Sequence, residues 1–414
     1  MQHRETIMKT AKLTCIALLI LTMPGARGEP IRTDINPALI YYRALLLAPD
    51  LSPADRDYLF TTNWQGQTLP ERFGKLVAGY DNQFKLVREA TKQKVPCDWG
   101  IDMSPGPDTL LPHLNRVRAV ARAARLRAMW DLQHGNQIGA RDDLLAAFVL
   151  GRNASRDGIL ISALVQLAME GIVYDTVTEN FGRFSPETLK QLVDGFDAAP
   201  ARGTMANAIA TTEAHCFSDW VETRVLELRK EYPGNDAKVL ESLEQQVNDT
   251  NIWPRVVKAS GGTSDGFLKL VRDMQPLYPR LARIMTLPLP EYEDQIQKFE
   301  AEVRKSQNPL VPIFVLDLLG ARPKDFTFQA LEAMMRAAVE YKLHGESGLK
   351  SVMDPFGKGP FAFQRFVFEG VDRGFELKSA YTGRPAWPSA LIFVEKEGTP
   401  FYVDGPHIGE ALKP

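Results

Sequence analysis

Cysteine is scarce in this chain, with three among 414 residues and no pair in Cys-x-x-Cys spacing. This excludes a disulfide-dense scaffold and gives no support to a zinc–thiolate or dithiol redox site. The chain also has no His-Glu-x-x-His zinc motif and no Gly-x-x-x-x-Gly-Lys-Ser/Thr phosphate loop. The sequence therefore predicts neither a metal site nor a cofactor.

A surplus of positive charge is missing as well. The 49 Lys and Arg residues face 51 Asp and Glu residues, for a formal net charge of −2. Proteins dedicated to nucleic acids carry basic surfaces that neutralise phosphates, so no nucleic-acid partner is expected. The remaining composition, 44% apolar, 9% aromatic and 24% charged, is typical of a globular chain and excludes disordered and collagen-like classes.

The N-terminus has the pattern of an export signal. The first twelve residues carry three basic side chains and one acidic one, residues 13–23 are apolar, and Ala26 and Gly28 suit a small-residue cleavage site. The apolar run has about eleven residues, too few to cross roughly 30 Å of hydrocarbon as a helix. We expect a signal peptide over 1–28 and export to the periplasm or medium of a bacterium. The exported chain then has no membrane span; retention of the segment as an anchor is the alternative.

Cys97 and Cys216 are the cysteines left after such cleavage. In an oxidising compartment the two are candidates for a disulfide bridge. That bridge would close a loop of about 119 residues and stabilise the fold by about 4 to 5 kcal/mol in the chain-entropy model. Two buried free thiols are the alternative, and the sequence leaves both open.

Residues 36 to 345 show mostly helical apolar spacing. Asn36-Pro37, Ser52-Pro53 and Ser185-Pro186 are typical helix starts, and residues 127–150 resemble a tetratricopeptide-type hairpin that turns at Gly135. No strict 34-residue period occurs. The sequence predicts a mainly α fold, an irregular stack of helical hairpins over residues 29–348. Helices are expected near 110–133, 142–150, 158–181, 186–196, 206–230, 237–247, 266–285, 292–305 and 327–343.

The C-terminal residues 349–414 have a different character. Short aromatic or β-branched runs alternate with glycine- and proline-containing breaks. This pattern predicts a small antiparallel β module that docks on the helices. The expected strands are 361–368, 374–379, 391–395 and 401–403.

Two stretches resemble known proteins. Leu-Pro-His-Leu at 111–114, Asp-Asp-Leu-Leu-Ala-Ala at 142–147 and Leu-Ile-Ser-Ala-Leu-Val at 160–165 are similar to a pattern shared by a group of uncharacterised exported bacterial helical proteins. Asp-Pro-Phe-Gly-Lys at 354–358 and Gly-Phe-Glu-Leu-Lys-Ser at 374–379 resemble the C-terminal part of type II secretion pseudopilins. The chain lacks the pilin processing site after its apolar segment, which excludes a pilin subunit. The resemblance implies an exported helical protein and no particular chemistry.

Acidic residues supply the candidate catalytic groups. Asp98 and Asp102 flank Trp99 in a loop rich in proline and glycine, and Glu213 lies on a predicted helix. Paired carboxylates support general acid–base or glycosidic chemistry when their environments separate their pKa values. The alternative is that the two aspartates cap turns while Trp99 and Cys97 fix the loop to the helices.

A basic stripe is the candidate binding feature. Arg118, Arg122 and Arg125 recur at helical spacing and can hold an anionic partner. Alternatively, they pair with Asp142, Asp143 and other acids of the next helix.

The sequence therefore favours an exported helical scaffold or interaction protein, whose partner is an unidentified protein or an envelope polymer. Stacked helical hairpins present the broad surfaces that such proteins use. The alternative is a secreted hydrolase that acts on envelope or environmental polymers through Asp98, Asp102 and Glu213.

Overall fold

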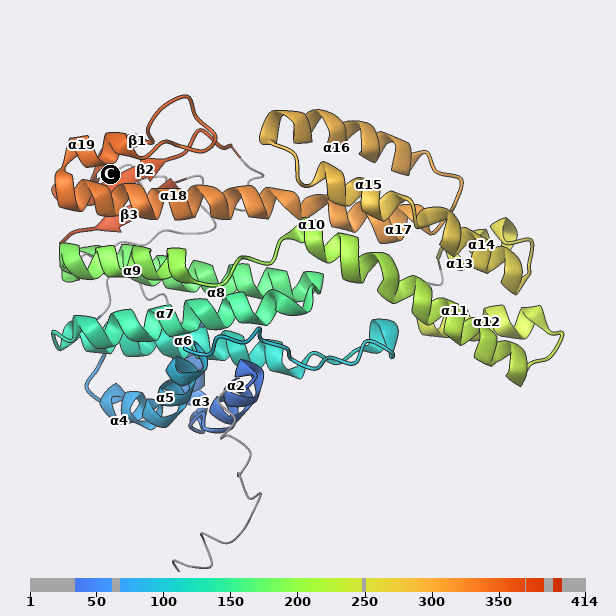
Figure 1. Cartoon of the computed structure of the whole chain (residues 1–414), viewed down its shortest axis with the longest axis horizontal. Coiled ribbons are helices and arrows are strands. Elements are labelled where there is room, and N and C mark those ends of the chain that lie inside the picture. The colour runs from blue at the N-terminus through green and yellow to red at the C-terminus, as the bar shows by residue number, and fades with distance from the viewer. Residues whose placement is uncertain (1–33, 62–67, 248–250, 369, 383–389, 397–414) are drawn as a thin grey trace, which may run out of the picture.

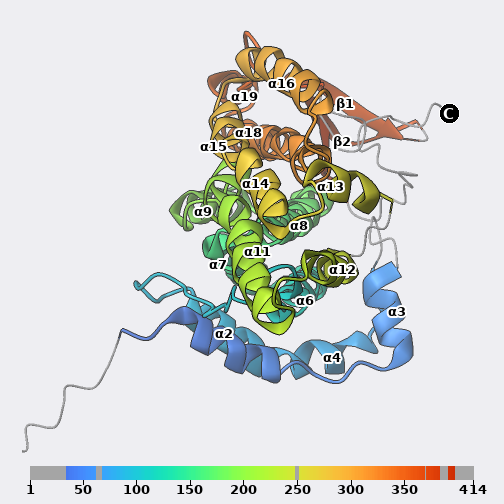
Figure 2. The same ribbon diagram turned by 90° about the vertical axis from the view of Figure 1, so that its right-hand side faces the viewer.

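The computed structural model describes residues 34–61, 68–247, 251–368, 370–382 and 390–396. The predicted signal, residues 1–28, lies outside them. The chain is mainly α with one small antiparallel sheet, which confirms the predicted fold class. In Figure 2, α2 to α4 lie along one edge and the sheet lies at the opposite edge, with α6 to α9 stacked between them.

The first part of the chain forms the stack of helical hairpins (Figure 1). The predicted turn at Gly135 is confirmed: this glycine has a φ of 77°, and Asn136 caps the next helix by accepting a hydrogen bond from the Gly139 amide at 3.0 Å. The helices are α2 (Pro37–Leu46), α3 (Pro53–Thr61), α4 (Phe73–Gly79), α5 (Asp81–Ala90), α6 (Pro112–Gln133), α7 (Gln137–Ala154), α8 (Leu160–Glu179) and α9 (Pro186–Ala198).

The three predicted helix starts are also confirmed. The Asn36 side chain accepts a hydrogen bond from the Ala38 amide, and each serine accepts one from the amide three residues ahead. A proline follows each cap, where its missing N–H leaves no helical hydrogen bond unmade. These short sequence signals place the entries to α2, α3 and α9.

The middle of the chain forms an arm of shorter helices that projects beside the stack (Figure 1). The predicted helix 206–230 contains a π-helical turn at Ile209–Glu213 between α10 and α11. The predicted helix 266–285 is two helices, because Pro276 supplies no N–H and precedes the second one. The arm comprises α10 (Met205–Ala208), α11 (Ala214–Glu231), α12 (Asp236–Val247), α13 (Trp253–Ala259), α14 (Ser264–Met274), α15 (Leu277–Ile284), α16 (Leu289–Arg304) and α17 (Val311–Leu316).

The chain then returns to the stack through its longest helix, and the sheet follows. Phe375 and Phe393 of the sheet pack against Phe181 and Tyr341 of the helical part, with ring centroids 4.9 to 5.6 Å apart. These rings belong to the same hydrophobic core as the helices. The predicted strand 401–403 lies outside the described residues. The elements are α18 (Arg322–His344), α19 (Glu346–Ser351), β1 (Ala362–Phe368), β2 (Val371–Lys378) and β3 (Ala390–Val394), with antiparallel order β1-β2-β3.

The two halves of the pseudopilin-like motif meet in space. The buried Asp354 carboxylate accepts hydrogen bonds from the Ser379 hydroxyl at 2.8 Å and from the Ala380 amide at 2.6 Å. It also accepts one from the Phe356 amide at 3.0 Å. The motif therefore joins the end of β2 to the loop that enters the sheet.

Within the described residues, α8 is long and apolar enough to cross a membrane by length and composition. It is a core helix here, since it contacts α6, α7, α18 and β3. Packing against these neighbours explains its apolar character.

We expect Asp354→Ala to lower the free energy of unfolding by about 2 to 4 kcal/mol, because the change leaves the buried Ser379 hydroxyl and two amides without their acceptor. Urea denaturation measures this loss. Asp372→Ala on β2 is the control: its carboxylate is substantially exposed and pairs with Arg365, so about 1 kcal/mol or less is expected. Equal losses in the two variants would contradict the assigned role of Asp354.

Candidate functional site

The two loop aspartates proposed as catalytic groups each hold a turn. Asp98 accepts a hydrogen bond from the Gly100 amide, and Asp102 accepts one from the Ser104 amide, both at 2.9 Å. The hydrogen bonds with Ser104 lower the pKa of Asp102. Both side chains are exposed. This is the geometry of the turn-capping alternative.

Aromatic packing fixes the same loop to the helices. The Trp99 ring stacks on His113 of α6 at a centroid distance of 4.5 Å and on Tyr41 of α2 at 5.8 Å. Its indole N–H donates a hydrogen bond to the Asn153 carbonyl of α7 at 2.9 Å. Trp99 and Cys97 are buried. The loop therefore closes one side of the helical core.

Glu213, the third catalytic candidate, lies in the π-helical turn and faces the start of α8. Its carboxylate accepts a hydrogen bond from the Leu160 amide at 3.4 Å, and burial raises its pKa. Among the described residues, no hydrogen bond or ion pair joins Glu213 to Asp98 or Asp102. Each of the three acids has its own backbone partner instead.

Cys97 and Cys216 are free thiols, so the bridge alternative is not formed. Cys97 is buried as the other alternative expected, and Cys216 is half-buried beside a cavity of about 430 Å³. Burial raises the pKa of Cys97 to about 12, and burial together with Glu213 and Asp219 raises that of Cys216. Neither thiol has the lowered pKa of an activated nucleophile.

The arginine stripe is largely used inside the protein. The Arg125 Nη2 donates to both carboxylate oxygens of Glu179 on α8, at 2.9 and 2.7 Å. The Arg122 guanidinium lies 4.2 Å from the centroid of the Phe60 ring on α3. Only Arg118 is exposed. The stripe thus ties α6 to its neighbours, although not through the two aspartates that the sequence suggested.

One of those aspartates, Asp143, anchors a buried ion cluster instead. It is fully buried on α7 and pairs with Arg127 of α6 at 2.6 Å and Arg88 of α5 at 2.7 Å. Arg127 also reaches Asp81 at 2.7 Å and donates a hydrogen bond to the Val77 carbonyl of α4. This cluster fixes α5 against α6 and α7.

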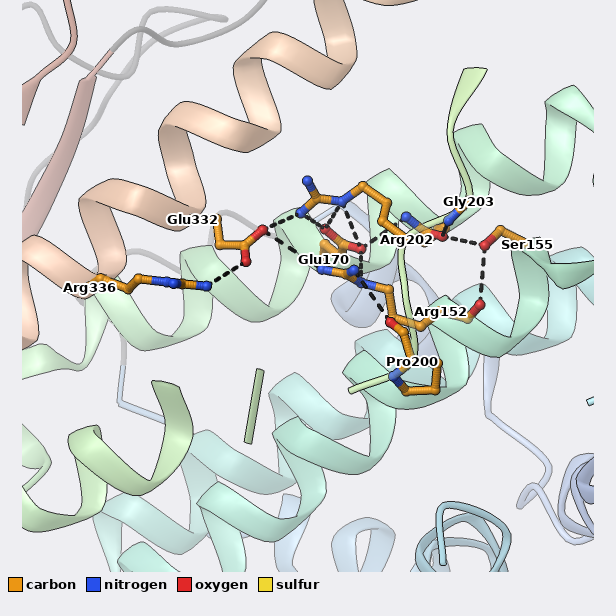
Figure 3. A network of polar contacts seen from close by, with 9 residues as sticks. Arg152, Ser155, Glu170, Pro200, Arg202, Gly203, Glu332 and Arg336 are labelled. Atoms are coloured by element: carbon orange, nitrogen blue, oxygen red, sulfur yellow. Dashed lines mark hydrogen bonds and ion pairs between the residues drawn. The ribbon is translucent and has the colours of Figure 1, made fainter. Parts of the chain in front are cut away.

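A second cluster surrounds Glu170 of α8 (Figure 3), whose side chain is completely buried. Arg152 of α7 and Arg202, in the loop before α10, each approach its carboxylate to 2.6 Å. Arg202 also pairs with Glu332 of α18 at 2.9 Å, and Arg336 completes the network on the same helix. The cluster therefore connects three layers of the stack.

Sequence reasoning missed the Glu170 cluster. Arg152, Arg202 and Glu332 lie 18, 32 and 162 residues from Glu170 in the sequence, and only Glu332 and Arg336 are linked by a local i,i+4 spacing. The available signal was a charged residue among apolar neighbours: Glu170 follows Met169 within the long apolar helix α8, and Arg152 lies in the apolar part of α7. A buried charge at such a position needs a partner.

A groove of about 700 Å³ runs along the outer face of α7 between α5 and α9. Its floor is apolar, with half-buried Leu145 and Val149. The ion clusters lie behind its two walls: Arg88 on the α5 wall pairs with Asp143, and Arg152 donates a hydrogen bond to the Pro200 carbonyl of the opposite wall at 3.5 Å. The lining residues are Lys85, Arg88, Glu89, Thr91, Lys92, Asp142, Leu145, Ala146, Val149, Gly195, Ala198, Ala199 and Pro200.

The wall formed by α5 presents cations to solvent. Lys85 and Lys92 are exposed, and neither forms an ion pair with any residue in the described part of the chain. The groove therefore combines a fixed shape, an apolar floor and two uncompensated positive charges. This combination makes it the candidate binding site.

The chain matches no protein-family model, and comparisons with curated proteins and with solved structures give no match. The functional argument therefore depends on the groove and the side chains around it.

Because His113 is buried, we expect the free energy of unfolding to fall in acid. Both its ring nitrogens are buried without a hydrogen-bond partner among the residues that the structure describes, and burial lowers its pKa to about 4. The unfolded chain binds the proton near pH 6.5, so the free energy of unfolding falls between about pH 6.5 and 4, by up to ~1.4 kcal/mol per pH unit. His113→Phe keeps a ring against Trp99 and removes this part of the pH dependence. Urea denaturation from pH 7.5 to 4 measures it.

The exposed His134, the C-cap residue that follows α6, provides the matched control, since His134→Phe should retain the acid loss of the unmodified chain. If His113→Phe kept the same slope as well, the buried imidazole would not be its source.

Removal of the Glu170 carboxylate should destabilise the fold strongly. Glu170→Ala leaves two buried guanidinium groups without their central partner, so we expect a loss of about 3 to 5 kcal/mol in denaturation experiments. Glu332→Ala is the control, because that partly exposed carboxylate leaves arginines that keep other partners or reach water. A loss of roughly 1 kcal/mol is expected there. The opposite order of losses would refute the central role of Glu170.

Proposed function

We propose that this chain is an exported, non-enzymatic helical scaffold that binds a partner protein in the groove between α5, α7 and α9. The observation that carries the proposal is the groove itself, whose apolar floor lies between walls fixed by buried ion clusters. Its α5 wall carries two lysines with no ion pair in the described part of the chain. Export to the periplasm or medium of a bacterium has two supports, the signal pattern over 1–28 and the resemblance to exported helical proteins.

The fixed walls favour binding. Association loses free energy when loops and side chains must become ordered, and a groove that already has its bound shape avoids much of that cost. Arg88 and Pro200 mark the two walls, and each contacts a charged side chain of a buried cluster. The volume of about 700 Å³ lies within the usual range of ligand sites.

The hydrolase alternative has no comparable support. Asp98 and Asp102 are committed to turns, and Glu213 faces the first amide of α8. Glycosidic chemistry needs two carboxylates on either side of one bond, about 5 to 10 Å apart. No observation favours that arrangement over a binding role.

Photo-crosslinking in the producing bacterium tests the groove. We expect benzoylphenylalanine in place of Ala198, an exposed groove residue at the end of α9, to give a discrete adduct with a partner protein. Ala259 is a matched control, because it is also an exposed alanine at the last position of a helix, α13. The adduct should disappear when Leu145→Asp places a charge on the apolar floor.

Folding of each variant is checked by its denaturation midpoint. Failure of position 198 to give an adduct, or the same adducts from positions 198 and 259, would count against the groove as the binding surface.

A further inference from the structure

We infer that the occupant of the groove is an acidic amphipathic helix, which rests on the proposed function and specifies the chemistry of the partner. The inference has three parts: the sign of the uncompensated charge, the spacing of the two free lysines and the apolar floor beside them.

The charge of the wall favours an anionic partner. Lys85 and Arg88 on α5 and Lys92 just after its C-terminal end line the groove, and Arg88 is already held by the buried Asp143. The two lysines are therefore the free cations. Their wall belongs to a chain whose formal net charge is −2, so positive charge gathers here against the overall balance. Charge complementarity of this kind selects the partner and speeds its association.

Two carboxylates also line the groove, and they differ. Asp142 pairs with Arg141 at 2.6 Å, so its charge is compensated. Glu89 is exposed and lies between the two lysines on α5. It reduces the attraction for an acidic ligand without reversing it. This difference makes Glu89 a useful position for a gain-of-affinity variant.

The spacing of the lysines favours a helix over an extended segment. Lys85 is on α5, and Lys92 follows the helix end by two residues, after Thr91 in right-handed helical conformation. The two lysines are therefore seven residues apart, about two helical turns and about 10 Å along the direction of α5. Acids at positions i and i+7 of a partner helix repeat this distance on one face. In an extended chain about three residues cover the same distance, and residues i and i+3 point to opposite faces. One helix therefore presents both acids to the wall, and one strand does not.

The floor supplies the apolar part of the contact. Leu145 and Val149 are four residues apart on α7 and form a ridge on its half-buried face. Ala198 and Pro200 border the ridge on the far side from α5. A partner helix with leucines at i+1 and i+8 carries them about 90° around its axis from acids at i and i+7, so the acids face the lysines while the leucines pack on the ridge.

Synthetic peptides test the inference on the purified full chain. The first is a fluorescein-labelled 18-residue helix with glutamates at i and i+7 and leucines beside them. Two further peptides replace these glutamates with glutamine or lysine, and a fourth replaces the leucines with serine. Fluorescence anisotropy gives the dissociation constants. We expect the glutamate peptide to bind at least tenfold more tightly than the other three and to weaken as salt rises.

Variants of the chain then locate the contact. Lys85→Glu combined with Lys92→Glu should weaken the glutamate peptide at least tenfold and improve binding of the lysine peptide. Glu89→Gln should tighten the glutamate peptide about two- to fivefold. The matched control combines Lys258→Glu with Lys305→Glu, two exposed lysines outside the groove with no ion pair in the described part of the chain, and should leave the affinity unchanged.

The possible failures separate the two proposals. Equal affinity for the glutamate and glutamine peptides overturns the acidic partner. The groove proposal survives in that case if Leu145→Asp abolishes the binding of both peptides. Equal weakening by the control pair shows a general charge effect and also overturns the inference. If no helical peptide binds although position 198 crosslinks a partner, the helical occupant is wrong. If position 198 gives no adduct either, the proposed function itself fails.

Discussion

The buried carboxylate of Glu170 is the constraint on which the arrangement of the stack depends. A carboxylate with no solvent exposure is several kcal/mol unfavourable unless cations and hydrogen bonds surround it. Its two arginines come from α7 and from the loop before α10, and one of them continues to Glu332 on α18. No single hairpin therefore satisfies Glu170, and the layers from α7 to α18 must assemble together. The cluster fixes the positions of α7, α8, the loop before α10 and α18 relative to one another. Apolar packing alone does not specify these positions.

The buried carboxylate of Asp143 is neutralised in the same way in a neighbouring part of the stack. It too is fully buried and holds two arginines from neighbouring elements, α5 and α6. The two clusters act on the opposite walls of one groove, since Arg88 stands on the α5 wall and Arg152 contacts the loop at Pro200. The shape of the groove thus follows from the ion pairs that neutralise the buried carboxylates Glu170 and Asp143. Its shape is tied to contacts that a partner does not touch.

The sequence predicted those parts of the fold that depend on neighbouring residues. Helix entries such as Ser185-Pro186 and the Gly135 turn are local signals, and the structure confirms them. The π-helical turn at Ile209–Glu213 has no comparable signal, so the sequence predicted one continuous helix there. The candidate site could not be predicted from neighbouring residues, because α5, α7 and α9 come together only in the folded chain. Asp98 and Asp102 resembled a catalytic pair because residue types and spacing are visible in a sequence, whereas the backbone amides that occupy them are not.

The buried carboxylates and the exposed lysines of this protein have different roles. Glu170 and Asp143 are neutralised inside, where an unpaired charge is most unfavourable, and they fix geometry without selecting a ligand. Lys85 and Lys92 form no ion pair within the described residues and lie at the surface, where water solvates them at little cost. In the binding mode that we propose, Glu89 beside them weakens the attraction to an acidic partner. A surface with every cation paired would lack selectivity, and an interior with unpaired cations would not fold. The buried charges therefore set the shape of the groove, and the exposed lysines set the charge of the partner that we propose for it.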